Sequence, residues 1–308
     1  METLTPVHKI LLSSYQAKFL LAALQQKQSF VYVSLDLGRT TETVEIKDSS
    51  FLFPGGQKLK IDDIKKVIKH DTAVYMVEDH SIRKVHFFNT ERNLFYKLYP
   101  VAADKPTTFD ISGINMHAIK DTDPWTDSKK KLEAIAAIHG KVLDTCMGLG
   151  YTAMFSAKEA DSVVTCERDV HVIELARINP WSRELFDGAK EGKIEILNMS
   201  SFDYVQKCGD ETFDVVIHDP PRPNFARELY SNAFYAEVLR VLKRGGKFYH
   251  YTGTPFASMQ KRNLADEIAR RLTSLGFAGV VKVYGGLLAK KQNTKTPQRS
   301  SDVITRAQ

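Results

Sequence analysis

A short string in the C-terminal half of the chain combines groups that can bind and orient an amine. Residues 213–222 read FDVVIHDPPR, so Asp219, Pro220 and Pro221 follow an apolar run typical of a buried strand. The Asp219 carboxylate and the Pro220 carbonyl can accept hydrogen bonds from an amino group, and the prolines hold that carbonyl in a fixed geometry. An amine held in this way directs its lone pair toward an electrophilic carbon. Asp219 and Pro220 are therefore candidate catalytic residues.

Side chains that follow this string, or that end the next strand, are candidates for contact with the acceptor. Arg222 can stack on a planar group or bind a phosphate or carboxylate, and Phe225 offers an aromatic face nearby. The later run FYHYTG ends with His250 and Tyr251, whose imidazole and phenol can orient an amine or relay its proton. A solvated arginine after a Pro-Pro turn and a structural histidine are the alternatives. We predict His250 as a further catalytic residue, and as substrate-binding residues Pro221, Arg222, Phe225 and Tyr251.

A second motif predicts a nucleotide site earlier in the chain. In KVLDTCMGLGYTA (residues 141–153), Asp144 ends an apolar strand, and Gly148 and Gly150 precede a helix. Glycines in such a turn let a ligand approach the backbone without a Cβ in the way. The next strand ends at Glu167, 23 residues after Asp144, a spacing at which a carboxylate can accept hydrogen bonds from ribose hydroxyls.

The same loop also fits a dinucleotide fingerprint, because GLGYTA matches GxGxxA. Two features count against a dinucleotide. The Asp144 carboxylate is unfavourable beside a pyrophosphate but compatible with a cationic sulfonium, and a whole dinucleotide fold would need a second mononucleotide half after the loop.

These residues resemble the signature of the class I S-adenosylmethionine (SAM)-dependent methyltransferases. In that family an acidic residue is followed by small residues at alternate positions, as in Asp-Thr-Cys-Met-Gly-Leu-Gly here, with cysteine where glycine is commonest. The resemblance implies that Glu167 binds the ribose of SAM and that serines after the third strand surround the adenine. It implies as cofactor-binding residues Asp144, Cys146, Gly148, Gly150, Glu167, Ser201 and Phe202.

The Asp-Pro-Pro string carries a narrower resemblance. Amino-group methyltransferases of the same superfamily have (Asp/Asn)-Pro-Pro-(Tyr/Phe) at this place, and Arg222 stands where their aromatic residue stacks on the target base. The strings SGINMHAIKDTDPW, NPWSREL and DPPRPNF resemble, over about residues 110–290, a group of largely uncharacterised methyltransferase-like proteins described mainly from archaea.

The order of the elements predicts an α/β fold. From Lys129 onward short apolar strands alternate with helices, which predicts a doubly wound, parallel, Rossmann-like methyltransferase sheet. Before it, residues 8–25 have helical spacing and are followed by short runs rich in Val, Tyr and Phe, which predict a smaller β-rich N-terminal domain. The polar segment before the first helix of the α/β unit is expected to close over the cofactor, with Thr126 or Asp127 capping that helix. The predicted parts are an N-terminal domain at 1–105, a linker at 106–128, the methyltransferase domain at 129–291 and a basic tail at 292–308.

Composition excludes several classes of protein. The chain has 308 residues, 43% of them hydrophobic, without an 18-residue apolar run or a basic N-terminal signal, so we expect a globular cytoplasmic protein without a membrane span. Its three cysteines lack CxxC spacing, so we expect buried thiols and no metal. Of the net charge of +6, +5 lies in residues 281–308, a segment suited to contact with phosphate or simply solvated.

Together these patterns favour a SAM-dependent N-methyltransferase acting on an exocyclic base amine of RNA, either rRNA or tRNA. The N-terminal domain and the basic tail would contact phosphate. One alternative is aminopropyl transfer from decarboxylated SAM to a polyamine, which needs several carboxylates around a polycation, whereas only Asp219 is found near the fourth strand. A non-catalytic RNA-binding protein with the same fold and a NAD-linked oxidoreductase are the others. The sequence leaves the oligomeric state open.

Overall fold

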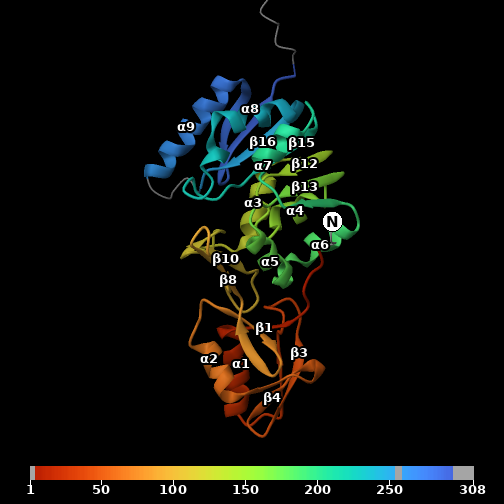
Figure 1. The fold of residues 1–308 in the computed structure, drawn as a ribbon, viewed down its shortest axis with the longest axis vertical. Helices are drawn as coiled ribbons and strands as arrows, with labels where there is room; N and C mark the ends of the chain where they lie inside the picture. Colours follow the sequence, from red (N-terminus) through yellow and green to blue (C-terminus); the bar gives the residue numbers. More distant parts are fainter. Residues whose placement is uncertain (1–3, 254–258, 294–308) are drawn as a thin grey trace, which may run out of the picture.

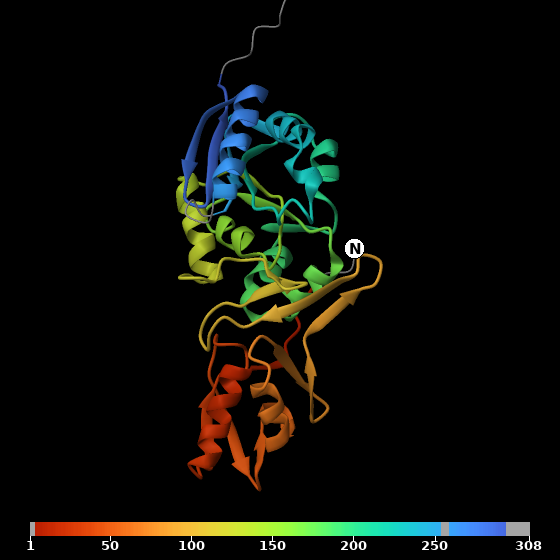
Figure 2. The same cartoon turned by 90° about the vertical axis from the view of Figure 1, so that its left-hand side faces the viewer.

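The computed structural model describes residues 4–253 and 259–293. The predicted basic tail lies almost entirely outside these residues. The described chain forms three parts that follow one another along its long axis (Figure 1). A β-rich unit lies at one end, a four-stranded sheet in the middle and a large α/β unit at the other end (Figure 2). Within the described residues, no helix combines the length and the apolar character needed to cross a membrane.

The first part consists of two small antiparallel sheets with two helices, α1 and α2, around an apolar core. One sheet has the order β1-β6-β7, formed by Ile10–Ser13, Val74–Glu78 and Ser81–Lys84. The other has the order β2-β3-β4-β5, formed by Phe30–Val33, Glu42–Lys47, Ser50–Leu52 and Lys58–Lys60. The helices are α1 (Ser14–Gln25), the short η1 (Pro54–Gly56) and α2 (Ile61–Ile68).

The helix predicted from residue 8 begins only at Ser14, because the four residues before it form β1. Ser13 fixes this start: its Oγ accepts from the Tyr15 N–H at 3.2 Å, while the Gln16 side chain accepts from the Ser13 N–H at 3.2 Å. This reciprocal pair is a capping box. Leu11 and Leu12 are buried in β1, which pairs with β6. This pairing provides hydrogen-bond partners for backbone groups that precede the helix.

The middle sheet joins the predicted N-terminal domain to the predicted linker. Its order is β11-β10-β9-β8, formed by Ile114–Asn115, Thr108–Ile111, Leu94–Tyr99 and His86–Asn89. Since β10 pairs with β9, the sheet crosses the boundary that we predicted at residue 105. Residues 108–111 and 114–115 are therefore strands within the segment that we predicted to be a linker.

The α/β unit contains a seven-stranded sheet with the order β14-β13-β12-β15-β16-β18-β17. The pairs from β14 to β16 are parallel, as predicted, but β18 is antiparallel to both of its neighbours, so the sheet is mixed. The strands are β12 (Lys141–Asp144), β13 (Ser162–Cys166), β14 (Ile194–Leu197), β15 (Phe213–His218), β16 (Leu242–Tyr251), β17 (Phe277–Val283) and β18 (Gly286–Lys291). The helices are α3 (Pro124–Ile135), α4 (Tyr151–Ser156), α5 (Val170–Ile178), η2 (Pro180–Ser182), α6 (Arg183–Lys190), α7 (Ser201–Lys207), η3 (Arg227–Tyr230), α8 (Asn232–Val241) and α9 (Met259–Leu275).

Consecutive residues of the central strands enter two different cores, which is the physical basis of a doubly wound sheet. Val142 and Val215 pack with residues of α3 to α6, whereas their neighbours Leu143 and Val216 pack with residues of α7 to α9. All four side chains are fully buried. Each strand must therefore be apolar on both sides, as the sequence indicated.

The loop after β12 depends on a glycine that another helix covers. Gly150 has φ +82°, and an added Cβ would lie 2.5 Å from a methyl carbon of the fully buried Leu185. Gly192 has a similar φ of +75° but nothing within 4 Å of an added Cβ. Comparing the same substitution at the two positions therefore separates the effect of backbone strain from that of steric overlap.

We expect Gly150→Ala to lower the free energy of unfolding by about 2–4 kcal/mol, through left-handed strain and overpacking together. The matched Gly192→Ala should cost only about 1 kcal/mol, for strain alone. Urea unfolding of both variants measures the difference. Equal losses would mean that Leu185 repacks freely and that Gly150 is needed for its backbone angle only.

Candidate active site

A cavity of about 640 Å³ lies at the carboxyl ends of the parallel strands. Ligands of open α/β sheets bind at this edge, and the volume is within the range of about 300–1,000 Å³ typical of small-molecule sites. Residues from the middle sheet, including Tyr96, Phe109 and Ile111, form part of its wall. The N-terminal half of the chain therefore contributes directly to the site.

Glu167 ties the glycine loop to the end of β13. Its Oε2 accepts from the Gly148 N–H at 3.2 Å and its Oε1 from the Asp169 N–H at 3.0 Å. Glu167, Cys146 and Gly148 all line the cavity. Burial raises the pKa of Glu167 to about 7, against the lowering effect of the two backbone hydrogen bonds. The structure thus brings together three of the predicted cofactor-binding residues.

Asp144 lies beneath the loop and is not among the residues that line the cavity. It is fully buried, and its Oδ2 accepts from the hydroxyls of Thr165 at 2.8 Å and Thr152 at 3.3 Å. Burial raises the pKa of Asp144 to about 7. The contacts of Asp144 and Gly150 are those of residues that shape the loop, and direct contact with a cofactor stays a prediction for both.

The predicted adenine-binding residues are divided between cavity and core. Ser200 caps α7 by accepting from the Phe202 N–H at 3.2 Å, and both Ser200 and Ser201 line the cavity. Ser201 is 3% exposed, and its Oγ has no hydrogen-bond partner among the described residues. A buried polar atom without a partner beside a cavity fits the polar edge of a bound nucleoside. Phe202 does not line the cavity but packs edge-to-face against Phe234.

The Asp-Pro-Pro string faces the same cavity, as predicted from its position after β15. Asp219 and Arg222 line it, with the prolines of the string and Phe225. The Tyr230 hydroxyl donates to the Pro221 carbonyl at 2.9 Å, which fixes the string against η3. Tyr251, at the end of β16, lines the cavity too.

His250 lies behind this surface, so its predicted role as a proton relay has no geometric support. It is fully buried and is not among the lining residues. Its Nδ1 lies 2.9 Å from the Tyr251 carbonyl, which can only accept, so Nδ1 carries the proton and Nε2 accepts from the Tyr235 hydroxyl at 2.8 Å. Burial lowers the pKa of His250 to about 4. A neutral histidine with both nitrogens occupied is a structural residue.

Lys131 on α3 lies in the site, although the sequence did not predict it as a site residue. Its ammonium lies 2.7 Å from Asp219 Oδ2, 2.8 Å from Asp127 Oδ2 and 4.0 Å from the centroid of the Tyr251 ring. Burial opposes the charge of Lys131, but the two carboxylates outweigh it and raise its pKa well above the usual value. Burial likewise raises the pKa of Asp219, and Lys131 opposes that shift.

A signal for Lys131 was present in the helical spacing. The buried positions of α3 recur at intervals of three and four residues, at Pro124, Asp127, Ser128, Lys131, Leu132 and Ile135. The predicted cap of α3, Thr126 or Asp127, is wrong. Asp123 caps α3 by accepting from two backbone N–H groups at 3.0 Å, which leaves Asp127 free to pair with Lys131.

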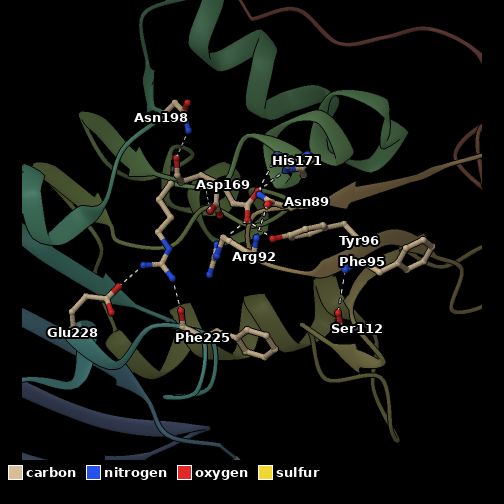
Figure 3. A network of polar contacts seen from close by, with 12 residues as sticks. Asn89, Arg92, Phe95, Tyr96, Ser112, Asp169, His171, Asn198, Phe225 and Glu228 are labelled. Carbon is tan, nitrogen blue, oxygen red and sulfur yellow. Dashed lines mark hydrogen bonds and ion pairs between the residues drawn. The ribbon is translucent and has the colours of Figure 1, made fainter.

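A second charged network links the middle sheet to the end of β13 (Figure 3). Arg92 lies 3.0 Å from Asp169 Oδ2, which also accepts from the Tyr96 hydroxyl. Arg168 pairs with Glu228 and also donates to the Phe225 carbonyl. All of these residues line the cavity.

Comparison with known proteins shows a family to which the chain belongs. The uncharacterized protein MJ1233 of Methanocaldococcus jannaschii is 38% identical over 269 residues, which cover 86% of this chain and 90% of that protein. The chain belongs to the same family as this protein. The spermine/spermidine synthase domain family matches residues 142–283. The resemblance to an archaeal group with the Asp-Pro-Pro-Arg string stays a prediction.

Other proteins that are similar to this chain have names that refer to polyamine synthesis. A polyamine aminopropyltransferase of Thermoplasma volcanium is 30% identical over 129 residues, which cover 42% of this chain and 44% of the relative. The structure of a spermidine synthase in complex with the transition-state analogue AdoDATO has a TM-score of 0.55 at 18% identity. The match covers 98% of this chain and 86% of the spermidine synthase chain. The spermidine synthase of Thermotoga maritima has a TM-score of 0.50 at 16% identity, covering 89% and 82%. These structures confirm the predicted fold, a methyltransferase-like sheet with a smaller β-rich N-terminal part.

Residues 142–283 are thus similar to a spermine/spermidine synthase domain, and the whole described chain has the fold of the spermidine synthases. SAM and decarboxylated SAM share an adenosine and a sulfonium. The residues present fit such a nucleoside, since Glu167 faces the cavity with carboxylate oxygens and Ser201 offers an unpartnered hydroxyl.

The pKa of Glu167 predicts how nucleoside binding depends on pH. Only the ionised carboxylate accepts hydrogen bonds fully, and with a pKa of about 7 Glu167 is mostly protonated at pH 6 and mostly ionised at pH 8. Affinity for 5′-methylthioadenosine, which has no group titrating in this interval, should therefore rise roughly tenfold between the two values.

Isothermal titration calorimetry at both pH values measures this change. Glu167→Gln should bind more weakly and lose most of the pH dependence, whereas Glu159→Gln, which alters an exposed residue, should keep both. Full pH dependence in Glu167→Gln would assign the effect to another group, such as Asp144.

Proposed function

We propose that this protein is an aminopropyltransferase, which transfers the aminopropyl group of decarboxylated SAM to an amine. One observation carries the proposal. The spermine/spermidine synthase match covers residues 142–283 and so contains Glu167 and Asp219, two carboxylates that line one cavity. The first can hold the nucleoside, and the second can hold the acceptor nitrogen close to it.

The bound donor supplies an electrophilic carbon next to a sulfonium. The protein's task is to present a neutral amine to that carbon in line with the bond that breaks. Asp219 Oδ2 is already bonded to Lys131 at 2.7 Å, and its Oδ1 has no partner among the described residues. Oδ1 can therefore accept an N–H of the acceptor and take up the proton that the nitrogen loses. The prolines after it keep the backbone fixed.

The relatives whose names state an activity are polyamine aminopropyltransferases, so a polyamine is the first acceptor to test. This is the alternative that the sequence disfavoured because only one carboxylate followed the fourth strand. The cavity supplies more, since Asp169 and Glu228 also line it, although each is paired with an arginine.

Methyl transfer from SAM to an exocyclic amine of RNA is a second candidate. The Asp219-Pro220-Pro221 string favours it, because it ends a parallel strand beside the nucleoside loop as in amino-group methyltransferases. Most of the basic tail on which RNA binding was predicted lies outside the described residues. Comparing affinity for SAM with that for decarboxylated SAM separates the two candidates, and failure to bind either supports a non-catalytic protein.

We expect Asp219→Asn to lower kcat by about 10²–10³, as for loss of a group that orients and deprotonates a nucleophile, with little change in nucleoside affinity. The assay follows aminopropyl transfer from decarboxylated SAM by mass spectrometry. Asp187→Asn, an exposed residue of α6, is the matched control and should be unaffected. Full activity of Asp219→Asn would remove Asp219 from the reaction. Methylated RNA in place of aminopropylated amine would favour the second candidate.

A further inference from the structure

The carboxylates that line the cavity are already occupied by the protein itself. Four are present, Glu167, Asp169, Asp219 and Glu228, and four cations line the same cavity, Arg92, Lys131, Arg168 and Arg222. A polycationic acceptor needs carboxylates that are free to face its ammonium groups, because buried or half-buried charges must be paired. The pairing of each carboxylate therefore decides which acceptors fit.

Asp219 is paired with the most buried of these cations. The Lys131 side chain is 3% exposed and lies between Asp219 and Asp127, which is fully buried. The Tyr284 hydroxyl donates to Asp127 Oδ1 at 2.9 Å and holds that carboxylate in place. A second ammonium at Asp219 would therefore lie close to the Lys131 ammonium and be repelled by it. A neutral amine has no net charge and would not be repelled in this way.

The other three carboxylates also have partners within the protein. Asp169 faces Arg92 at 3.0 Å, and Glu228 faces Arg168. Figure 3 shows Arg92 and Asp169 directed toward each other from two parts of the chain. Glu167 accepts two backbone N–H groups and is the predicted ribose ligand. In the described structure, no lining carboxylate is left for a polycation.

One lining cation has no ion pair among the described residues. Arg222 is exposed and lines the cavity, between Pro221 and Pro223, which fix its backbone. Tyr251 lines the same cavity, and Arg222, like Lys131, opposes the rise to about 12 that burial causes in the Tyr251 pKa. A guanidinium in this position is suited to bidentate contact with a planar anion.

We propose that the acceptor is an amine that also carries an anionic group, bound by Arg222, and that Lys131 excludes polycationic acceptors from Asp219. The inference rests on the proposed aminopropyl transfer and names the acceptor class for it. The acceptor nitrogen, neutral when it attacks, forms its bond to carbon as the carbon–sulfur bond breaks. The electron pair of that bond stays on sulfur, and the proton of the nitrogen passes to Asp219. Lys131 acts through Asp219 and is a positioning residue.

The test compares acceptors that differ only in the anion. Lysine is cadaverine with a carboxylate, and ornithine is putrescine with a carboxylate; O-phosphoethanolamine and ethanolamine form the corresponding phosphate pair. Affinity is measured by calorimetry with the full chain saturated with 5′-methylthioadenosine, and transfer is measured separately with decarboxylated SAM. We expect at least one anion-bearing amine to bind more tightly than its partner by about tenfold or more, and the pair that responds identifies carboxylate or phosphate as the anion.

Variants connect this preference to the two residues. Arg222→Ala should reduce the ratio of affinities within the preferred pair about fivefold to tenfold, whereas Arg270→Ala, an exposed arginine of α9, should leave it unchanged. Lys131→Met alone leaves two carboxylates unpaired and threatens folding, so it is combined with Asp127→Asn. This double variant should shift the preference toward the diamines, whereas Lys129→Met, an exposed residue of the same helix, should not.

The outcomes separate the two proposals. Equal or better binding of every unsubstituted amine, or a ratio that Arg222→Ala leaves unchanged, overturns the inference even if aminopropyl transfer is observed. Preference for the anion-bearing amine without any aminopropyl transfer keeps the acceptor class and overturns the proposed function instead. Restored diamine binding in the double variant assigns the exclusion to Lys131, and its absence removes Lys131 from acceptor selection.

Discussion

Parallel pairing of β12 with both β13 and β15 is the constraint from which the site follows. The pairing aligns Asp144 with Thr165 on one side and with Ile217 on the other. Whatever follows the three strands must therefore emerge at one edge of the sheet, namely the glycine loop, Glu167 and Asp219. The strands can be fixed so firmly because they are buried on both sides, and a one-residue slip would move every side chain into the wrong core.

A buried lysine between two carboxylates is a costly element unless all three groups stay paired. Removing one partner of such a group typically costs about 3–5 kcal/mol, since a charge is left in a medium that solvates it poorly. Lys131, Asp127 and Asp219 therefore hold α3 against the end of β15 as a unit. Burial raises the pKa of Asp219, and Lys131 opposes that rise, which favours the ionised carboxylate as a hydrogen-bond acceptor for an incoming amine.

How far the sequence predicts this structure depends on whether the signal is local. The alternation of strands and helices from Lys129 onward was predictable, because these elements have a clear apolar period between turn-forming residues. The cavity surface around Asp219 and Glu167 was likewise predictable, since strand ends share an edge. Lys131 was missed because it ends a run of three lysines that looks solvated on composition. The direction of β18 and the contact between Arg92 and Asp169, 77 residues apart, depend on tertiary packing that no local pattern encodes.

The contact between Arg92 and Asp169 also gives the N-terminal half a defined place in the site. Asp169 caps α5 by accepting from the His171 N–H at 3.1 Å, and its own N–H donates to Glu167. The turn between β8 and β9 therefore acts on the same short segment that carries the predicted ribose ligand. A displacement of the middle sheet would change the end of β13 and the cavity wall together. The N-terminal part is thus a structural component of the pocket, and any role in holding a large acceptor must be compatible with that position.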